Sequence, residues 1–187
     1  MIINSHRLFE NPYTYVNGNP ISKIDPLGLY PALQVTLPNG STYIPMTTVK
    51  NPGQANQYDL PIGTPTAIPV PPGVDPQAQV DLWSYASQVG AGAINFGLYW
   101  SSPSNDYKQQ NPMYDAYGNF AYGATGAAAG YSCGLLTGVG DLLHGGTNYP
   151  INTNDIISGY NAISSGGTLN VIDYTPPTPF GIQGGGW

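Results

Sequence analysis

Alternating apolar and polar residues mark the stretch from residue 33 to residue 46, which reads LQVTLPNGSTYIPM. A period of two is typical of a strand that is buried on one face. Pro38-Asn39-Gly40 interrupts the alternation with residues that favour a tight turn. The pattern therefore predicts a β-hairpin.

Prolines dominate the next stretch, at positions 52, 61, 65, 69, 71, 72 and 76. Because proline fixes φ and lacks an amide hydrogen, it favours extended chain over helix or central strand. We expect a proline-rich strap or linker here.

Helical spacing begins after Asp75-Pro76, a plausible helix start, and continues to Tyr99, before Ser101-Ser102-Pro103. The apolar positions three and four residues apart are Val80, Trp83, Ala86, Val89, Ala93, Phe96 and Tyr99. We expect a buried core helix over residues 77–100; glycines at 90, 92 and 97 weaken it, so a broken helix is the alternative.

Residues 116–140 carry no charge, and glycine recurs every fourth residue at 126, 130, 134 and 138. On one helix these glycines share a face and permit close packing, which we expect against the helix containing Trp83. The same arrangement occurs in packed membrane helices, so a membrane-permeabilising segment is an alternative.

NTNDIISGYNAI, from residue 152 to 163, predicts a short helix, and the Pro- and Gly-rich tail is expected to be peripheral.

These patterns together predict an α+β fold: a small N-terminal β-hairpin and a proline-rich strap packed on a Gly/Ala-rich helical core. We divide the chain into residues 1–29, the hairpin and strap at 30–76, the helical core at 77–165 and a tail at 166–187.

Charge is scarce: 7% of residues are charged, and the net charge is −6. After residue 29, two lysines stand against eight aspartates, without an arginine. Proteins that bind nucleic acid normally neutralise phosphates with Lys and Arg. The sequence thus has no DNA-binding signature and disfavours a nuclease, although a bound divalent metal could supply positive charge. Fifteen tyrosines favour a folded domain.

Polar side chains that could perform chemistry gather between residues 106 and 144. Paired carboxylates can divide acid and base roles, a lysine can stabilise an oxyanion, and an amide can position water. The candidate catalytic residues are Asp106, Lys108, Asp115, Asn119, Asp141 and His144. The same carboxylates could bind a divalent ion, or could instead cap turns on the surface. Cys133, the only cysteine, lies among small apolar residues and is expected to pack rather than react.

NPYTYVNGNPISKIDPLGL, from residue 11 to residue 29, resembles the end of the Rhs (YD-repeat) core. In that family the closing D-P-x-G-L motif marks self-cleavage after its leucine. The matching residues here are Asp25, Pro26, Gly28 and Leu29. The resemblance implies that the downstream residues are a toxin enclosed by an Rhs shell until delivery. The shell itself needs many hundreds of residues beyond this remnant. No secretory signal peptide opens the chain, which agrees with export by delivery, such as type VI secretion.

A second motif, D-Y-K followed by G-N-F-x-Y-G-A-T-G-x-A-x-G, resembles the signature of polymorphic toxin type 44. Its residues here are Asp106, Tyr107, Lys108, Gly118, Asn119, Tyr122, Gly123, Gly126 and Gly130. Some relatives carry His where Ala121 stands, so a histidine at that position is not obligatory. Both resemblances imply an effector toxin with a cognate immunity protein, used in competition between bacteria or against a host.

From these observations we expect a secreted hydrolase that acts on the target cell envelope, with peptidoglycan or another glycan as substrate. The target periplasm is favoured over the cytoplasm. A metal-assisted ribonuclease in the target cytoplasm is the first alternative. A membrane-permeabilising toxin acting through residues 116–140 is the second.

Overall fold

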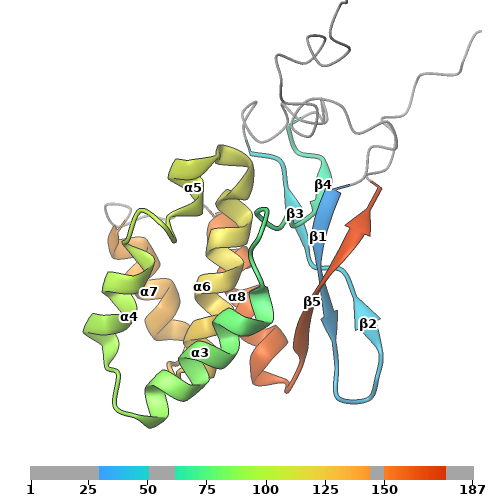
Figure 1. Ribbon diagram of the computed structural model, residues 1–187. Helices are drawn as coiled ribbons and strands as arrows, with labels where there is room; N and C mark the ends of the chain where they lie inside the picture. The colour runs from blue at the N-terminus through green and yellow to red at the C-terminus, as the bar shows by residue number, and fades with distance from the viewer. Residues whose placement is uncertain (1–29, 51–61, 144–149, 176–187) are drawn as a thin grey trace, which may run out of the picture.

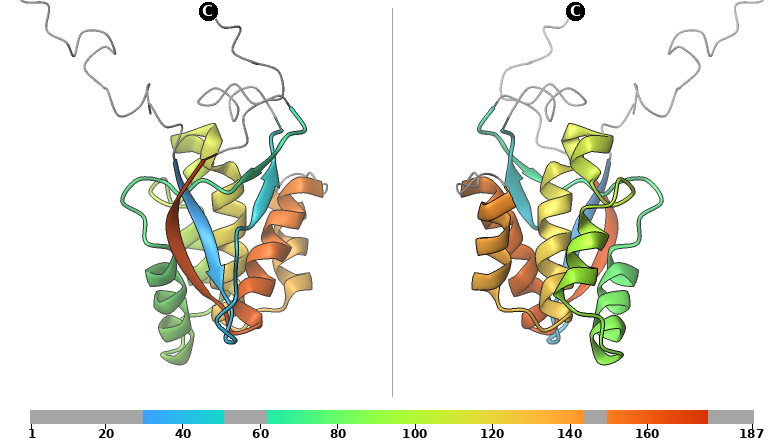
Figure 2. Two further views of the ribbon diagram at one scale, coloured as in Figure 1. Left: turned by 90° about the vertical axis from the view of Figure 1, so that its right-hand side faces the viewer. Right: turned by 90° about the vertical axis from the view of Figure 1, so that its left-hand side faces the viewer.

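The computed structural model describes residues 30–50, 62–143 and 150–175. The D-P-x-G-L motif with Asp25, Pro26, Gly28 and Leu29 lies outside the described residues, and so does His144. Helices occupy one side of the strands (Figures 1 and 2), and buried side chains of both layers meet in the main core. This is the α+β arrangement that the sequence predicts.

The central strand, β1 (Tyr30–Thr36), pairs with β2 (Thr42–Tyr43) in the predicted hairpin, with Val35 opposite Tyr43. Gly40 has a backbone φ of 81°, which residues with a Cβ atom rarely adopt, so a glycine at this position allows the tight turn. On its other edge β1 pairs with β5 (Thr168–Tyr174), which is also antiparallel.

The sequence predicts a peripheral tail at residues 166–187, but residues 168–174 form strand β5. Its seven residues pair with the whole of β1, from Tyr30 opposite Tyr174 to Thr36 opposite Thr168. Leu169 faces the core and is buried. The segment reads TLNVIDY, which suits a strand, but its partner lies more than 130 residues earlier in the chain. Only the tertiary fold brings the two together.

Part of the proline-rich strap also joins a ladder. Residues 65–67 form β4 (Pro65–Ala67), which pairs with β3 (Met46–Thr48), and Leu33 N donates to Ile68 O at 3.0 Å. The described part of the strap is extended at β4, as predicted. It is also part of the core, because Ile68 and Val70 are buried against the helices.

The helix predicted over 77–100 is two helices, α3 (Pro76–Gln88) and α4 (Ala93–Trp100). Asp75 begins α3 by accepting a hydrogen bond from Ala78 N at 3.0 Å. Between the helices Gly90 takes φ 90°, so the chain turns at one of the glycines that weaken the pattern. The one-turn helix α5 (Tyr107–Gln110) and a 3₁₀ turn, η2 (Pro112–Tyr114), follow.

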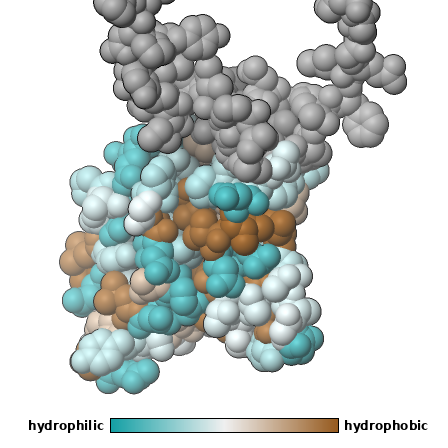
Figure 3. Space-filling view, turned by 45° about the vertical axis from the view of Figure 1, so that its right-hand side comes forward, coloured by the Kyte–Doolittle hydropathy of each residue, from teal (hydrophilic) through white to brown (hydrophobic). Residues whose placement is uncertain are grey.

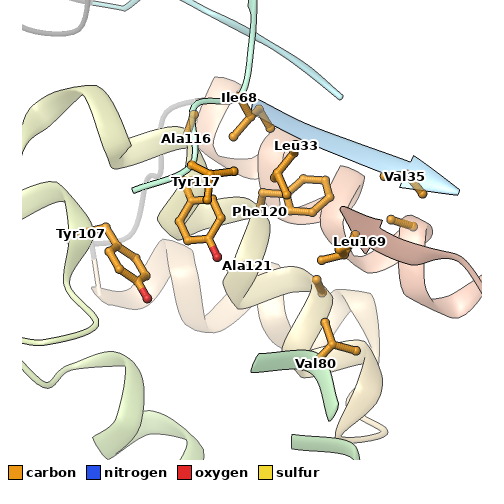
Figure 4. Close-up of a cluster of buried hydrophobic side chains, with 13 residues drawn as sticks. Leu33, Val35, Ile68, Val80, Tyr107, Ala116, Tyr117, Phe120, Ala121 and Leu169 are labelled. Atoms are coloured by element: carbon orange, nitrogen blue, oxygen red, sulfur yellow. The ribbon is translucent and has the colours of Figure 1, made fainter. Parts of the chain in front are cut away.

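Three further helices form the centre of the helical layer: α6 (Asp115–Ala128), α7 (Cys133–Leu143) and α8 (Pro150–Ser164). Side chains of α6 meet the sheet in the main core (Figure 4). There Tyr117, Phe120 and Ala121 pack against Leu33 and Leu169. The helix is thus buried on most of its surface, which explains why it carries no charge after Asp115.

The glycines that allow the closest helix contact are Gly123 and Gly159, rather than the series from 126 to 138. A Cβ atom on Gly123 would overlap the carbonyl oxygen of Ile156, and one on Gly159 would overlap that of Phe120. Helices α6 and α8 therefore touch backbone to backbone.

The series from 126 to 138 does not lie on one helix. Helix α6 ends at Ala128, Gly130 turns with φ 83°, and α7 begins at Cys133. Gly126 alone of the four meets a close neighbour, Leu136. No helix in the described ranges combines the length and apolar character needed to cross a bilayer.

With the sheet side turned forward, polar and apolar side chains share the surface, with an apolar patch near its middle (Figure 3). Exposed large apolar residues on the strands are Tyr43, Met46 and Val171. Although few residues are charged, this face of the protein therefore carries polar side chains as well as apolar ones.

We expect Gly159→Ala to lower the free energy of unfolding by about 2–4 kcal/mol, because the added methyl overlaps backbone that cannot turn aside. Gly138→Ala is the matched control: it is also helical, has open space at its Cβ position, and should change stability by less than about 1 kcal/mol or raise it. Urea denaturation followed by circular dichroism measures both. Equal losses in the two variants would contradict a backbone contact at Gly159.

Candidate active site

Asp115 is the first residue of α6, where the helix N-terminus favours a negative charge. It is buried, and Lys50 Nζ lies 2.6 Å from its Oδ2. Lys108 Nζ lies 3.8 Å from its Oδ1, and Asn119 Nδ2, one turn further along, donates to the same oxygen at 3.4 Å. Two ammonium groups and an amide thus surround this carboxylate.

Lys50 links three parts of the chain that are far apart in sequence. It lies two residues after β3, and its side chain is 11% exposed. Besides Asp115, it donates to Asn152 Oδ1 and lies 3.9 Å from Asp155 Oδ2, both on α8. Thr47 donates to the same oxygen of Asp155 at 3.2 Å. We call these residues the Lys50 cluster: Thr47, Lys50, Asp115, Asn152 and Asp155.

The Lys50 cluster contains one lysine and two carboxylates. Burial raises the pKa of Asp155 from 3.8 to about 7, and the charge of Asp115 adds to this, against the opposing effects of Lys50 and the Thr47 hydroxyl. With a proton on Asp155, the cluster reduces to a neutral pair between Lys50 and Asp115. The arrangement therefore favours a proton on Asp155.

A cavity of about 680 Å³ lies beside Asp115, within the size range usual for small-molecule sites. Its polar lining comes from α5, α6 and the residues that precede α5: Ser101, Asn105, Asp106, Lys108, Gln109, Asp115 and Asn119. Aromatic rings line it as well: Phe96, Trp100, Tyr107, Tyr122 and Tyr131. Asp115 is the one residue shared by this cavity lining and the Lys50 cluster.

Four of the predicted residues meet at this cavity: Asp106, Lys108, Asp115 and Asn119. Asp106 also caps α5, since its carboxylate accepts from Gln109 N at 3.3 Å and Gln109 Nε2 at 2.7 Å. Asp106 therefore both caps a turn, as the sequence alternative had it, and lines the cavity.

The other predicted residues are not brought to the same place. Asp141, half-buried on α7, is absent from the described cavity lining, although its neighbour Gly140 belongs to it. Cys133 is a half-buried free thiol at the start of α7. His144, another of the predicted residues, lies outside the described residues.

Lys50 and Asn152 were missed by sequence reasoning. Lys50 could have been predicted from the sequence, because it is one of two basic residues after residue 29. A buried carboxylate in this part of the chain therefore has only two side-chain cations with which it can pair. Asn152 gives no such signal, since the sequence is rich in polar uncharged residues.

The donor set gives little support to a divalent metal. Within the described ranges, no three His, Cys, Asp or Glu residues are grouped as metal ligands. The ammonium of Lys50 stands near both Asp115 and Asp155, where a cation bridging these carboxylates would have to lie.

Comparisons with family models, curated proteins and solved structures find no match for this chain.

Lys50→Met should lower the free energy of unfolding by roughly 3–5 kcal/mol, because it leaves buried carboxylate charge without its cation. Lys108→Met is the matched control. The Lys108 side chain is 55% exposed, so its loss should cost less than about 1 kcal/mol. Urea denaturation at pH 8 measures both variants, and similar small losses would show that Lys50 is not the central cation.

The raised pKa of Asp155 also predicts a pH dependence. Between about pH 4 and pH 7 the folded state keeps a proton that the unfolded chain releases, so this group makes the protein less stable as pH rises. Asp155→Asn removes that effect. From pH 4 to pH 8 the stability of the variant relative to wild type should rise by roughly 2–4 kcal/mol. Urea denaturation across this range tests it, and a constant difference would contradict the protonated state.

Proposed function

We propose that this chain carries an Rhs-associated effector toxin that hydrolyses a glycan of the target cell envelope, such as peptidoglycan. The observation that carries the proposal is the convergence of Asp106, Lys108, Asp115 and Asn119 on one cavity. These residues belong to, or flank, the motif that resembles polymorphic toxin type 44. The aromatic rings in the same cavity suit the apolar faces of sugar rings.

The proposed chemistry gives each polar residue one role. Asp115 accepts a proton from the attacking water, and Asn119 orients that water. Asp106 is the candidate donor of a proton to the leaving oxygen, while Lys108 stabilises negative charge that develops there. Water is thus added across the glycosidic bond without a redox step. Lys50 is a positioning residue, because it holds Asp115 without lining the cavity.

Delivery follows from the Rhs resemblance. Cleavage after Leu29 would release a chain that begins at Tyr30, the first residue of β1, and would leave every described element intact. The partners in this proposal are the Rhs shell before release and a cognate immunity protein that protects the producing cell.

Inducible expression in a bacterium, with and without a periplasmic signal, tests the proposal. We expect killing and release of soluble wall fragments only with the signal. Asp115→Asn should raise survival at least about 100-fold, since loss of a general base costs 10²–10⁴ in rate. Asp81→Asn, an exposed carboxylate on α3, is the control and should remain toxic.

Circular dichroism melting shows whether each variant is folded. Killing without the signal, together with RNA degradation, would favour a ribonuclease instead. Immediate depolarisation without any cleaved substrate would favour a membrane-permeabilising toxin. Full toxicity of a folded Asp115→Asn variant would show that the candidate site is wrong.

A further inference from the structure

The cavity beside Asp115 has two chemically different sides. Its α5 and α6 side carries the charged and amide groups already described. Its α4 and α7 side is mostly apolar: Ala93, Phe96, Gly97, Leu135, Leu136 and Val139 line it, beside the indole of Trp100 and the hydroxyl of Ser101. The lining as a whole thus matches a ligand that is polar at one end only.

A saccharide alone fits the α4 and α7 side poorly. Sugar hydroxyls placed against alanine, leucine and valine would lose their water without gaining partners, which costs free energy for each group. A hydrocarbon chain in the same place would gain free energy for every methylene removed from water.

The apolar lining continues to the outside of the protein. Leu135 lines the cavity and is also 49% exposed. On α4, Ala93 and Gly97 line the cavity, and the residues that follow them, Ile94 and Leu98, are 79% and 65% exposed. No charged residue occurs in α4. A chain could therefore pass from the cavity to the surface along apolar side chains.

We propose that the substrate is an amphiphile: a saccharide head joined to an alkyl or prenyl chain. The head lies against Asp115, Asn119 and Lys108, and the chain lies between α4 and α7. This inference rests on the proposed function, because the proposed hydrolysis of a glycan is what identifies the head of the ligand as a saccharide. It narrows the substrate from envelope glycans in general to lipid-linked ones.

Gly97 offers a way to fill the apolar side without disturbing the catalytic candidates. It lies within α4 and lines the cavity, and a Cβ atom there would meet nothing within 4 Å. Gly97→Leu should therefore occupy the space of the chain. Gly134→Leu is the matched control, because Gly134 is also helical and has open space, but lies outside the described cavity lining.

Isothermal titration calorimetry with the full chain provides the test. The probes are octyl β-glucoside, kept below its critical micelle concentration, and methyl β-glucoside, which has the same head without the chain. We expect the octyl compound to bind at least about 10-fold more tightly, with one molecule per protein. Gly97→Leu should remove that advantage, and Gly134→Leu should keep it.

Equal affinity for the two glucosides would overturn the inference, and so would equal effects of the two leucine variants. The first comparison needs only the wild-type protein, so a variant that fails to fold does not block the test. Periplasmic toxicity that depends on Asp115 but shows no preference for the octyl chain would leave the proposed function standing. Octyl preference without toxicity would support the ligand class and count against the toxin.

Discussion

The contact between α6 and α8 at Gly123 and Gly159 is the constraint on which the rest of the structure depends. Neither position has room for a Cβ atom, so the two backbones approach more closely than side chains would permit. Both helices begin near Lys50, as the contacts of Asp115 and Asn152 show. The glycine contact therefore brings two helix N-termini, each favourable to negative charge, to one buried lysine.

Lys50 makes this convergence possible electrostatically. Two buried carboxylates would repel one another and lose hydration, and a single ammonium can neutralise only one of them. The raised pKa of Asp155 is the consequence: burial keeps a proton on that residue. Asp115 is the closer carboxylate to Lys50, at 2.6 Å, and it lines the cavity. Stability and the proposed chemistry are thus coupled through one residue.

The break between α3 and α4 gives the cavity its other wall. Because Gly90 takes a positive φ, the chain turns there, and α4 becomes a separate wall of the cavity. On α4, Phe96 packs with Trp83 and Tyr131. An unbroken helix over 77–100 would have carried residues 93–97 away along the axis of α3. The uncharged helix α4 therefore has a structural use, because its residues Ala93, Phe96, Gly97 and Trp100 line the cavity.

Local patterns in the sequence were sufficient for the hairpin at Asn39-Gly40, the start of α3 at Asp75-Pro76 and the proximity of Asp106, Lys108, Asp115 and Asn119. Each depends on residues close together in the chain, where spacing and turn chemistry decide the outcome. Strand β5, the Gly123–Gly159 contact and the Lys50 cluster join residues that are 36 to 144 positions apart. Such pairings depend on which surfaces the whole chain can bury at once, and therefore only the tertiary structure decided them.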